Sequence, residues 1–158
     1  MDIIRPMARS KTPRPTPPAL GWREWVSLPA LGIERIKAKL DTGARSSAIH
    51  AFDIELFQRD GRQLVRFSVH PEQRSAAATR PCEAEVVDER QVRSSMGTRQ
   101  QRLVIVTPVR VGEQEWPIEL TLARRDQMGF RMLLGRQALA RRFVVDPGRS
   151  FLGTPDVR

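Results

Sequence analysis

The sequence predicts an all-β domain, barrel-like or a sandwich, with one short helix in its C-terminal half. Three observations favour this fold class. Short apolar stretches with alternating polarity recur along the chain, turn residues separate them at regular intervals, and helical periodicity is convincing in one segment only. A chain of 158 residues with 40% hydrophobic residues suffices for a single domain with a real core.

Residues 1–20 differ in composition from the rest of the chain. They are rich in proline and arginine and show no hydrophobic period, so we expect a flexible arm with polyproline character. The domain is expected to span residues 21–158. No apolar stretch follows the basic residues of the arm as a signal peptide requires, and no apolar run is long enough to span a membrane. The single cysteine, Cys82, fits a reducing compartment, so we expect a cytoplasmic protein.

The expected elements follow one another along the chain. Two alternating stretches, WREWVSL and GIERIKAKL, are separated by the turn PALG. Two strands within residues 51–70 are joined at Asp60-Gly61, a strong hairpin signal. Strands are also expected within residues 82–92, 101–111, 111–123, 130–135 and 143–148. The helix is expected at residues 136–143, where Leu139 and Phe143 lie one turn apart.

Two motifs carry the strongest functional signal. Residues 38–44, AKLDTGA, form an apolar strand that ends in Asp-Thr-Gly-Ala, and residues 130–136, FRMLLGR, form an apolar strand that ends in Gly-Arg. Asp-Thr-Gly alone occurs by chance in many turns. In this order, with hairpins between the motifs and a helix after the second, the chain resembles the retropepsin-like aspartic peptidases. The resemblance implies an acid-protease barrel in which the Asp-Thr-Gly loop carries the catalytic carboxylate, Asp41.

A narrower resemblance is to bacterial proteins labelled ATP-dependent zinc proteases. It rests on GWREWVSLPALGIERIKAKLDTGARSSAIHAF, VRFSVHP, VRSSMG, MGFRMLLGR and VVDPGRSFL. The zinc and ATP parts of that label find no support, because His50, His70 and Cys82 make a poor metal set and no GxxxxGK phosphate loop is present. We therefore expect no metal and no cofactor. Some members are encoded beside an ATP-grasp ligase that adds glutamates to a ribosomal protein, which implies a ribosomal-protein or glutamate-ligase partner.

Carboxylate chemistry requires two catalytic groups. One carboxylate acts as base on a water while the other acts as acid, and two such groups close together share one proton because both cannot ionise. The chain contains one Asp-Thr-Gly, and VVDPG around Asp146 is not a second copy. If Asp41 is catalytic, its partner is Asp41 of a second subunit, which predicts a homodimer.

The resemblance also implies roles for the neighbours of Asp41. Thr42 would hydrogen-bond across the dimer axis, Gly43 would leave room for substrate, and Gly135 would let the supporting strand pack closely. Ala44 lacks the hydroxyl that many pepsin-like sites place there to stabilise the ionised carboxylate. The pKa of the dyad should therefore be less depressed, which suits activity nearer neutral pH.

Two further features concern substrate binding. Met96 and Gly97 lie at a hairpin tip that is either a flap over the substrate or an ordinary exposed hairpin. In retroviral members an aspartate follows Asp-Thr-Gly-Ala and pairs with the arginine of Gly-Arg, whereas here Arg45 would face Arg136. Two nearby cations need an anionic partner, either an acidic substrate or a carboxylate of the chain itself. The intramolecular candidates are Asp53, Glu55, Asp126 and Asp146.

The sequence is compatible with three functions. The leading one is a homodimeric aspartic endopeptidase, acting on peptides or proteins that are acidic or glutamate-tailed. The alternative is a non-catalytic basic binding or regulatory module on the same fold. A nucleic-acid-binding β-barrel is the third, because the net charge of +9 favours acidic partners. Aromatic residues make up only 6% of the chain, which does not support a base-stacking platform.

Overall fold

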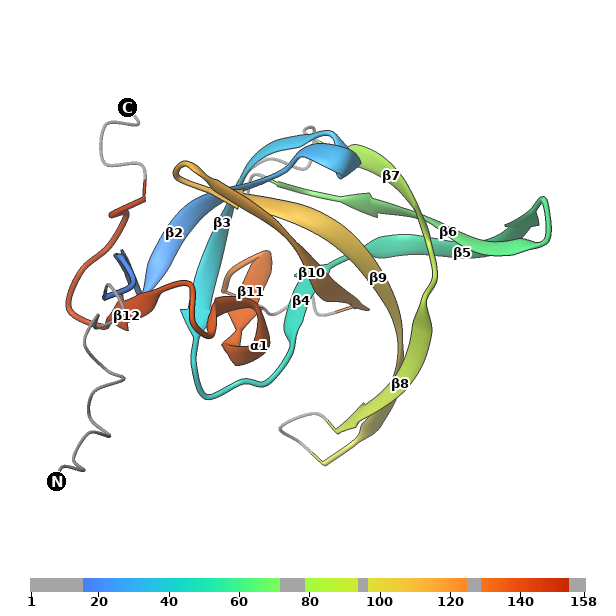
Figure 1. The fold of residues 1–158 in the computed structure, drawn as a ribbon. Helices are drawn as coiled ribbons and strands as arrows, with labels where there is room; N and C mark the ends of the chain where they lie inside the picture. Colours follow the sequence, from blue (N-terminus) through green and yellow to red (C-terminus); the bar gives the residue numbers. More distant parts are fainter. Residues whose placement is uncertain (1–15, 72–78, 94–96, 125–128, 154–158) are drawn as a thin grey trace, which may run out of the picture.

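The computed structural model describes residues 16–71, 79–93, 97–124 and 129–153, and strands dominate it (Figure 1). The elements are β1 (Ala19–Gly21), β2 (Arg23–Leu28), the 3-10 helix η2 (Pro29–Leu31), β3 (Ile33–Asp41), β4 (Ser47–His50), β5 (Phe52–Arg59), β6 (Arg62–Val69), β7 (Arg80–Glu85), β8 (Asp88–Arg93), β9 (Arg99–Val111), β10 (Gln114–Ala123), β11 (Met132–Gly135), α1 (Arg136–Leu139) and β12 (Val144–Asp146).

The largest sheet closes into a barrel. Its strands follow the order β10-β4-β11-β3-β2-β9, and β9 pairs again with β10 to complete the ring, while β8 extends the sheet from β9. A three-stranded sheet, β5-β6-β7, projects from the barrel, and β1 and β12 form a small parallel pair at the opposite side (Figure 1). The mainly β class is confirmed, and the architecture is a barrel rather than a sandwich.

The core fills this barrel, follows the alternation of its strands, and continues into the three-stranded sheet through Val65, Phe67, Val69 and Cys82. On β3, Ile36, Ala38 and Leu40 point inward and are buried, while Lys39 between them is exposed. Full burial of one large aliphatic side chain stabilises the folded state by about 1.5–3 kcal/mol. Asp41, the last residue of β3, directly follows the buried Leu40. The packing of Leu40 in the core therefore fixes the position of Asp41.

Most expected strands are present, and the differences have physical reasons. Both turn residues between β5 and β6 have positive φ, 53° at Asp60 and 76° at Gly61, as the primed hairpin turns require. Residues 82–92 form parts of two strands, β7 and β8, which belong to different sheets. The sequence reading missed β4 and β1, because both are short and depend on parallel partners distant in sequence, β10 and β12.

The expected helix is present but shorter than residues 136–143. It ends after Leu139, where the backbone of Ala140 leaves helical geometry with ψ 131°. The amide of Phe143 still donates to the Leu139 carbonyl at 3.1 Å, so both side chains are buried on the same side as expected. Of the arm expected at residues 1–20, residues 1–15 lie outside the described residues, while β1 begins at Ala19 and Leu20 is buried.

A buried carboxylate fastens the C-terminal segment to the barrel. Glu24 on β2 is fully buried, and its two carboxylate oxygens accept three backbone N–H groups. The donors are Gly21 at 2.6 Å, Leu152 at 2.7 Å and Gly153 at 2.9 Å. This one side chain therefore joins β1, β2 and the segment that follows β12, which runs alongside β2 in Figure 1.

We predict that Glu24→Gln lowers the free energy of unfolding by about 2–4 kcal/mol, because an amide N–H₂ would face backbone donors that now reach a carboxylate. Urea denaturation checks this. The matched control is Glu113→Gln in the exposed β9–β10 turn, which should change stability by no more than about 0.5 kcal/mol. Equal denaturation midpoints for the two variants would show that the backbone hydrogen bonds to Glu24 do not stabilise the fold.

Candidate active site

The two sequence motifs meet in the barrel wall. β11 runs parallel to β3 in the register Met132↔Ala38 through Gly135↔Asp41. Asp41, the last residue of β3, therefore lies beside Gly135, the last residue of β11. The expectation that AKLDTGA and FRMLLGR belong together agrees with this placement.

The Asp-Thr-Gly turn presents a carboxylate at the surface. The amide of Gly43 donates to Oδ1 of Asp41 at 2.9 Å, and the amide of Ala44 donates to the Asp41 carbonyl at 3.2 Å. Thr42 and Gly43 are exposed and Asp41 is half-buried. A Cβ on Gly43 would approach Oδ1 of Asp41 to 3.2 Å. Glycine at this position thus keeps the space beside the carboxylate clear.

The chain after β11 supports this turn from beneath. The amide of Arg136 donates to the Ala44 carbonyl at 2.6 Å, and the amide of Gln137 donates to the Arg45 carbonyl at 3.1 Å. A Cβ on Gly135 would overlap the Ser46 carbonyl oxygen and lie 2.9 Å from the Ala44 carbonyl oxygen. Gly135 therefore lies directly under the Asp41 loop, where a side chain would not fit.

Ser47 is a supporting residue that the sequence reading missed. Its buried hydroxyl accepts the Gly135 amide at 3.0 Å, and its carbonyl accepts the Thr121 hydroxyl at 3.1 Å. Ser47 thereby ties β4 to both β10 and β11. The available signal was the apolar alternation with Ile49, which buries the polar Ser47 side chain and so requires a partner for it.

Arg45 and Arg136 are both exposed next to this turn. The Arg136 guanidinium donates to the Thr42 carbonyl at 3.1 Å. In the described part of the chain, no ion pair includes Arg45 or Arg136. None of the carboxylates considered as intramolecular partners of these arginines pairs with them among the described residues. Glu55 pairs with Arg66 at 3.1 Å, and Asp146 accepts the Gly148 amide at 2.9 Å. Asp53 lies exposed on β5, and Asp126 is outside the described residues.

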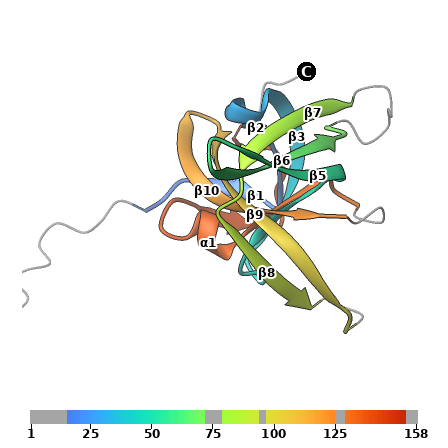
Figure 2. The same cartoon turned by 90° about the vertical axis from the view of Figure 1, so that its right-hand side faces the viewer.

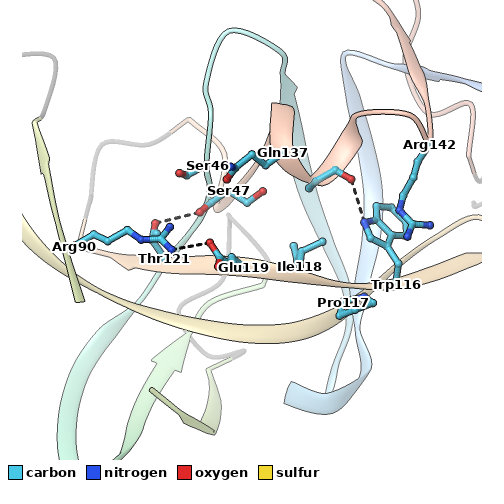
Figure 3. Close-up of a pocket in the computed structure, with 11 residues that line it drawn as sticks. Ser46, Ser47, Arg90, Trp116, Pro117, Ile118, Glu119, Thr121, Gln137 and Arg142 are labelled. Atoms are coloured by element: carbon cyan, nitrogen blue, oxygen red, sulfur yellow. Dashed lines mark hydrogen bonds and ion pairs between the residues drawn. The ribbon is translucent and has the colours of Figure 1, made fainter. Parts of the chain in front are cut away.

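A cavity of about 330 Å³ opens beside the loop, between the start of β4, β10 and α1 (Figure 3). Ser46 and Gln137, which directly follow Arg45 and Arg136 in sequence, line one side of it. On the opposite side, Trp116 donates its indole N–H to the Ala138 carbonyl at 3.0 Å and so holds α1 against β10. The cavity therefore offers space and hydrogen-bonding side chains at residues that directly follow Arg45 and Arg136, although neither arginine lines it.

The hairpin of β8 and β9 lies on the same side of the barrel as the β3–β4 loop (Figures 1 and 2). At its base, Arg90 contacts Glu119 of β10 at 2.9 Å and Asp88 at 2.9 Å, and these hydrogen bonds raise the pKa of Arg90. Gly97 near the tip has φ 83°, and Met96 lies outside the described residues. A flap role for this hairpin agrees with its position and stays a prediction.

The histidines stand apart from the Asp41 turn. His70 contacts the Thr79 hydroxyl at 3.2 Å and stacks on Phe52 at 4.4 Å, and the buried His50 stacks on the same ring at 6.3 Å. Over residues 16–71, 79–93, 97–124 and 129–153, no group of three or more His, Cys, Asp and Glu side chains could hold a metal ion. Within those ranges, no helix has the length and hydrophobicity needed to cross a membrane.

The combination of this barrel, the Asp-Thr-Gly turn and the strand ending in Gly-Arg agrees with a sequence comparison. Residues 19–156 match the model of the family described as RimB-like, retropepsin-like aspartic endopeptidase RimB. The chain belongs to the RimB-like family. The resemblance to retropepsin-like peptidases drawn from the two motifs is thereby confirmed.

Known relatives of this RimB-like chain differ in length. A protein of Shewanella pealeana named "probable alpha-L-glutamate ligase" is 47% identical over 132 residues, which cover 84% of this chain and 29% of that protein. A Desulfotalea psychrophila protein of the same name is 48% identical over 128 residues, which cover 81% and 28%. The chain thus spans less than a third of these relatives. A crystal structure of a Legionella pneumophila protein of unknown function matches with a TM-score of 0.73 and 26% identity, over 87% of this chain and 98% of that one.

We predict that Gly135→Ala destabilises the fold by more than about 2 kcal/mol, because the added methyl group meets backbone carbonyl oxygens that cannot rotate away. Gly129→Ala is the matched control, since a Cβ there meets nothing within 4 Å. Thermal or urea unfolding measures both variants. If Gly135→Ala is no less stable than Gly129→Ala, the claim that Gly135 packs too closely under the Asp41 loop to admit a side chain is wrong.

Proposed function

We propose that the protein is an aspartic endopeptidase that acts as a homodimer with one Asp41 from each subunit. The observation that carries this proposal is the exposed Asp41–Thr42–Gly43 turn, supported from beneath by Gly135 and Ser47. An endopeptidase carboxylate has to act in a site shielded from bulk water. A single subunit leaves the turn at its surface, and a second subunit placed on a two-fold axis would cover it.

The proposed reaction follows from two carboxyl groups sharing one proton. The ionised carboxylate removes a proton from a water, whose oxygen attacks the peptide carbonyl carbon, while the protonated carboxyl group donates its proton to the carbonyl oxygen. Collapse of the tetrahedral species breaks the C–N bond: the carboxyl group that took the water proton gives it to the departing amine nitrogen, and the other carboxylate takes a proton from a hydroxyl of the tetrahedral carbon, so the pair again shares one proton. The bond between the Gly43 amide and Oδ1 of Asp41 orients one carboxylate oxygen and leaves the other for water and substrate. Thr42 is exposed beside it and would bond to the partner subunit's loop.

The charges around the turn favour an acidic substrate. Arg45 and Arg136 lie exposed on the loop and its support, with no carboxylate of the described residues paired to them. A substrate carboxylate would supply the missing anion, and the adjacent cavity with Ser46 and Gln137 offers it room. The two relatives named as glutamate ligases contain a segment like this chain within a longer polypeptide. We infer glutamate-rich or glutamate-tailed peptides as the substrate class, with a glutamate-ligated protein, for instance a ribosomal protein, as the natural source.

We predict that Asp41→Asn reduces peptide cleavage by at least about 10³-fold while leaving the fold intact, because the amide cannot take a proton from water. Cleavage of a glutamate-rich peptide, followed by chromatography, measures the loss. The control is Asp60→Asn in the β5–β6 turn, where Asn-Gly is an equally favoured turn sequence.

The same assay separates the other readings. A metallopeptidase would lose activity on treatment with a chelator, and the proposed enzyme would not. A binding module would show no cleavage with the wild-type chain and would keep its partner affinity in Asp41→Asn. Either result would overturn the peptidase proposal.

We predict that Arg45→Ala lowers kcat/KM for a glutamate-rich peptide by about tenfold and leaves cleavage of a neutral peptide nearly unchanged, because a charge-assisted hydrogen bond to substrate is worth about 1.5–3 kcal/mol. Arg62→Ala on the distant β6 is the matched control and should change neither rate. Equal losses on both peptides, or no loss on either, would rule out the role of Arg45 in substrate choice.

A further inference from the structure

The outer face of β2 and β3 carries cations and aromatic rings that the proposed peptidase chemistry does not use. In the antiparallel register, Arg23 lies opposite Lys39 and Trp25 lies opposite Lys37. Their side chains point away from the core, whose residues alternate with them along both strands. We call this surface the β2–β3 face and define it by Trp22, Arg23, Trp25, Arg35, Lys37 and Lys39.

The cations and rings of the β2–β3 face are interleaved. The Arg35 guanidinium lies 3.8 Å from the centre of the Trp25 ring, and Lys37 Nζ lies 5.6 Å from the same ring. Arg23 lies 4.8 Å from the Trp22 ring and 5.1 Å from that of Phe151. The Phe151 ring in turn stacks on Trp25 at 5.9 Å with an angle of 18°. Half-exposed indole rings are thus held in fixed positions between positive charges.

These positive charges are not compensated within the described part of the chain. None of the ion pairs there includes Arg23, Arg35, Lys37 or Lys39. The arginines of the β5-β6-β7 sheet behave differently: the described pairs include Arg59 with Glu83, Arg62 with Glu85 and Arg66 with Glu55. Carboxylates therefore pair with Arg59, Arg62 and Arg66 on that sheet, whereas the cations of the β2–β3 face are left available to an anionic partner.

A hollow of about 550 Å³ lies beside Trp25 on this face. Arg35 and Arg80 line it together with the Trp25 indole, and Glu34 is its one acidic residue among those described. An aromatic wall with guanidinium groups beside it matches a planar base joined to a phosphate. The composition of the chain, with few aromatic residues, did not indicate such a platform. It arises because the fold stacks Phe151 on Trp25 and places Arg23 against both Phe151 and Trp22.

We propose that the β2–β3 face binds single-stranded nucleic acid. Phosphates would contact Arg35, Lys37 and Lys39. An unpaired base would take the place of the exposed Arg35 guanidinium over the Trp25 ring, as Arg35 turns from the ring to a phosphate. A single strand fits better than a duplex because only unpaired bases expose their faces to aromatic side chains. A purely acidic polypeptide would use the cations but would not require indole rings between them. This binding is independent of Asp41, so it stands or falls separately from the proposed peptidase.

The test measures fluorescence anisotropy of labelled oligouridylate and oligothymidylate, each about 12 nucleotides long, over a range of salt concentrations. Comparison of the two oligonucleotides distinguishes RNA from DNA as the source of the ligand. In Arg35→Glu/Lys37→Glu we expect affinity to fall by at least about tenfold, and the slope of log K against log salt to decrease by about 1.4, roughly 0.7 per lost phosphate contact. The control is Arg59→Glu/Arg62→Glu, which makes the same change in net charge on the β5–β6 hairpin and should have a much smaller effect.

Tryptophan emission provides a second readout. Binding should quench the half-exposed Trp22 and Trp25, whereas a polyglutamate peptide should not, and Trp116 is buried away from this face. Equal losses in the two charge-reversal variants, or no binding at low salt, would overturn the proposal. Binding of polyglutamate in place of the oligonucleotides would assign the face to an acidic protein instead. If the charge-reversal variant does not fold, Arg35→Gln/Lys37→Gln removes the same charges under the same criteria.

Discussion

The parallel pairing of β11 with β3 is the constraint on which the candidate site depends. It places Gly135 beside Asp41, and the missing side chain of Gly135 lets the following backbone reach the Ala44 and Arg45 carbonyls. Ser47 then fixes β11 to β4 through the Gly135 amide. A carboxylate held by backbone bonds on a barrel strand needs little reorganisation when it reacts, which is the physical advantage of building the site on strands rather than on a long loop.

Arginines and lysines without a paired carboxylate among the described residues gather in two regions. Arg45 and Arg136 accompany the Asp41 turn, whereas Arg35 and Lys37 lie on the outer wall of the barrel among aromatic rings. The first region would select what is cleaved, and the second would bring the protein to a polyanion. Several carboxylates are engaged elsewhere: Glu83 and Glu55 pair with arginines of the β5-β6-β7 sheet, and Glu24 is enclosed by backbone donors.

Local patterns in the sequence predicted the elements that make local contacts. The β5–β6 turn at Asp60-Gly61, the strands before Asp41 and Gly135, and the helix at Arg136 were all expected, because alternation and turn chemistry encode them directly. β1 and β4 were missed because only distant partners make them strands. The support from Ser47 was missed for the same reason, since its bonds span residues far apart in sequence. The meeting of the two motifs was available only through resemblance to a family, not from spacing.

The central claim is that each active site contains two Asp41 residues, one from each subunit. Mixing wild-type and Asp41→Asn subunits by co-refolding, and measuring cleavage per total subunit, tests it most directly. If both carboxylates are required, activity follows the square of the wild-type fraction and falls to about one quarter at equal amounts. A linear fall, to about one half at equal amounts, would mean that each Asp41 acts without its partner and would contradict the shared site.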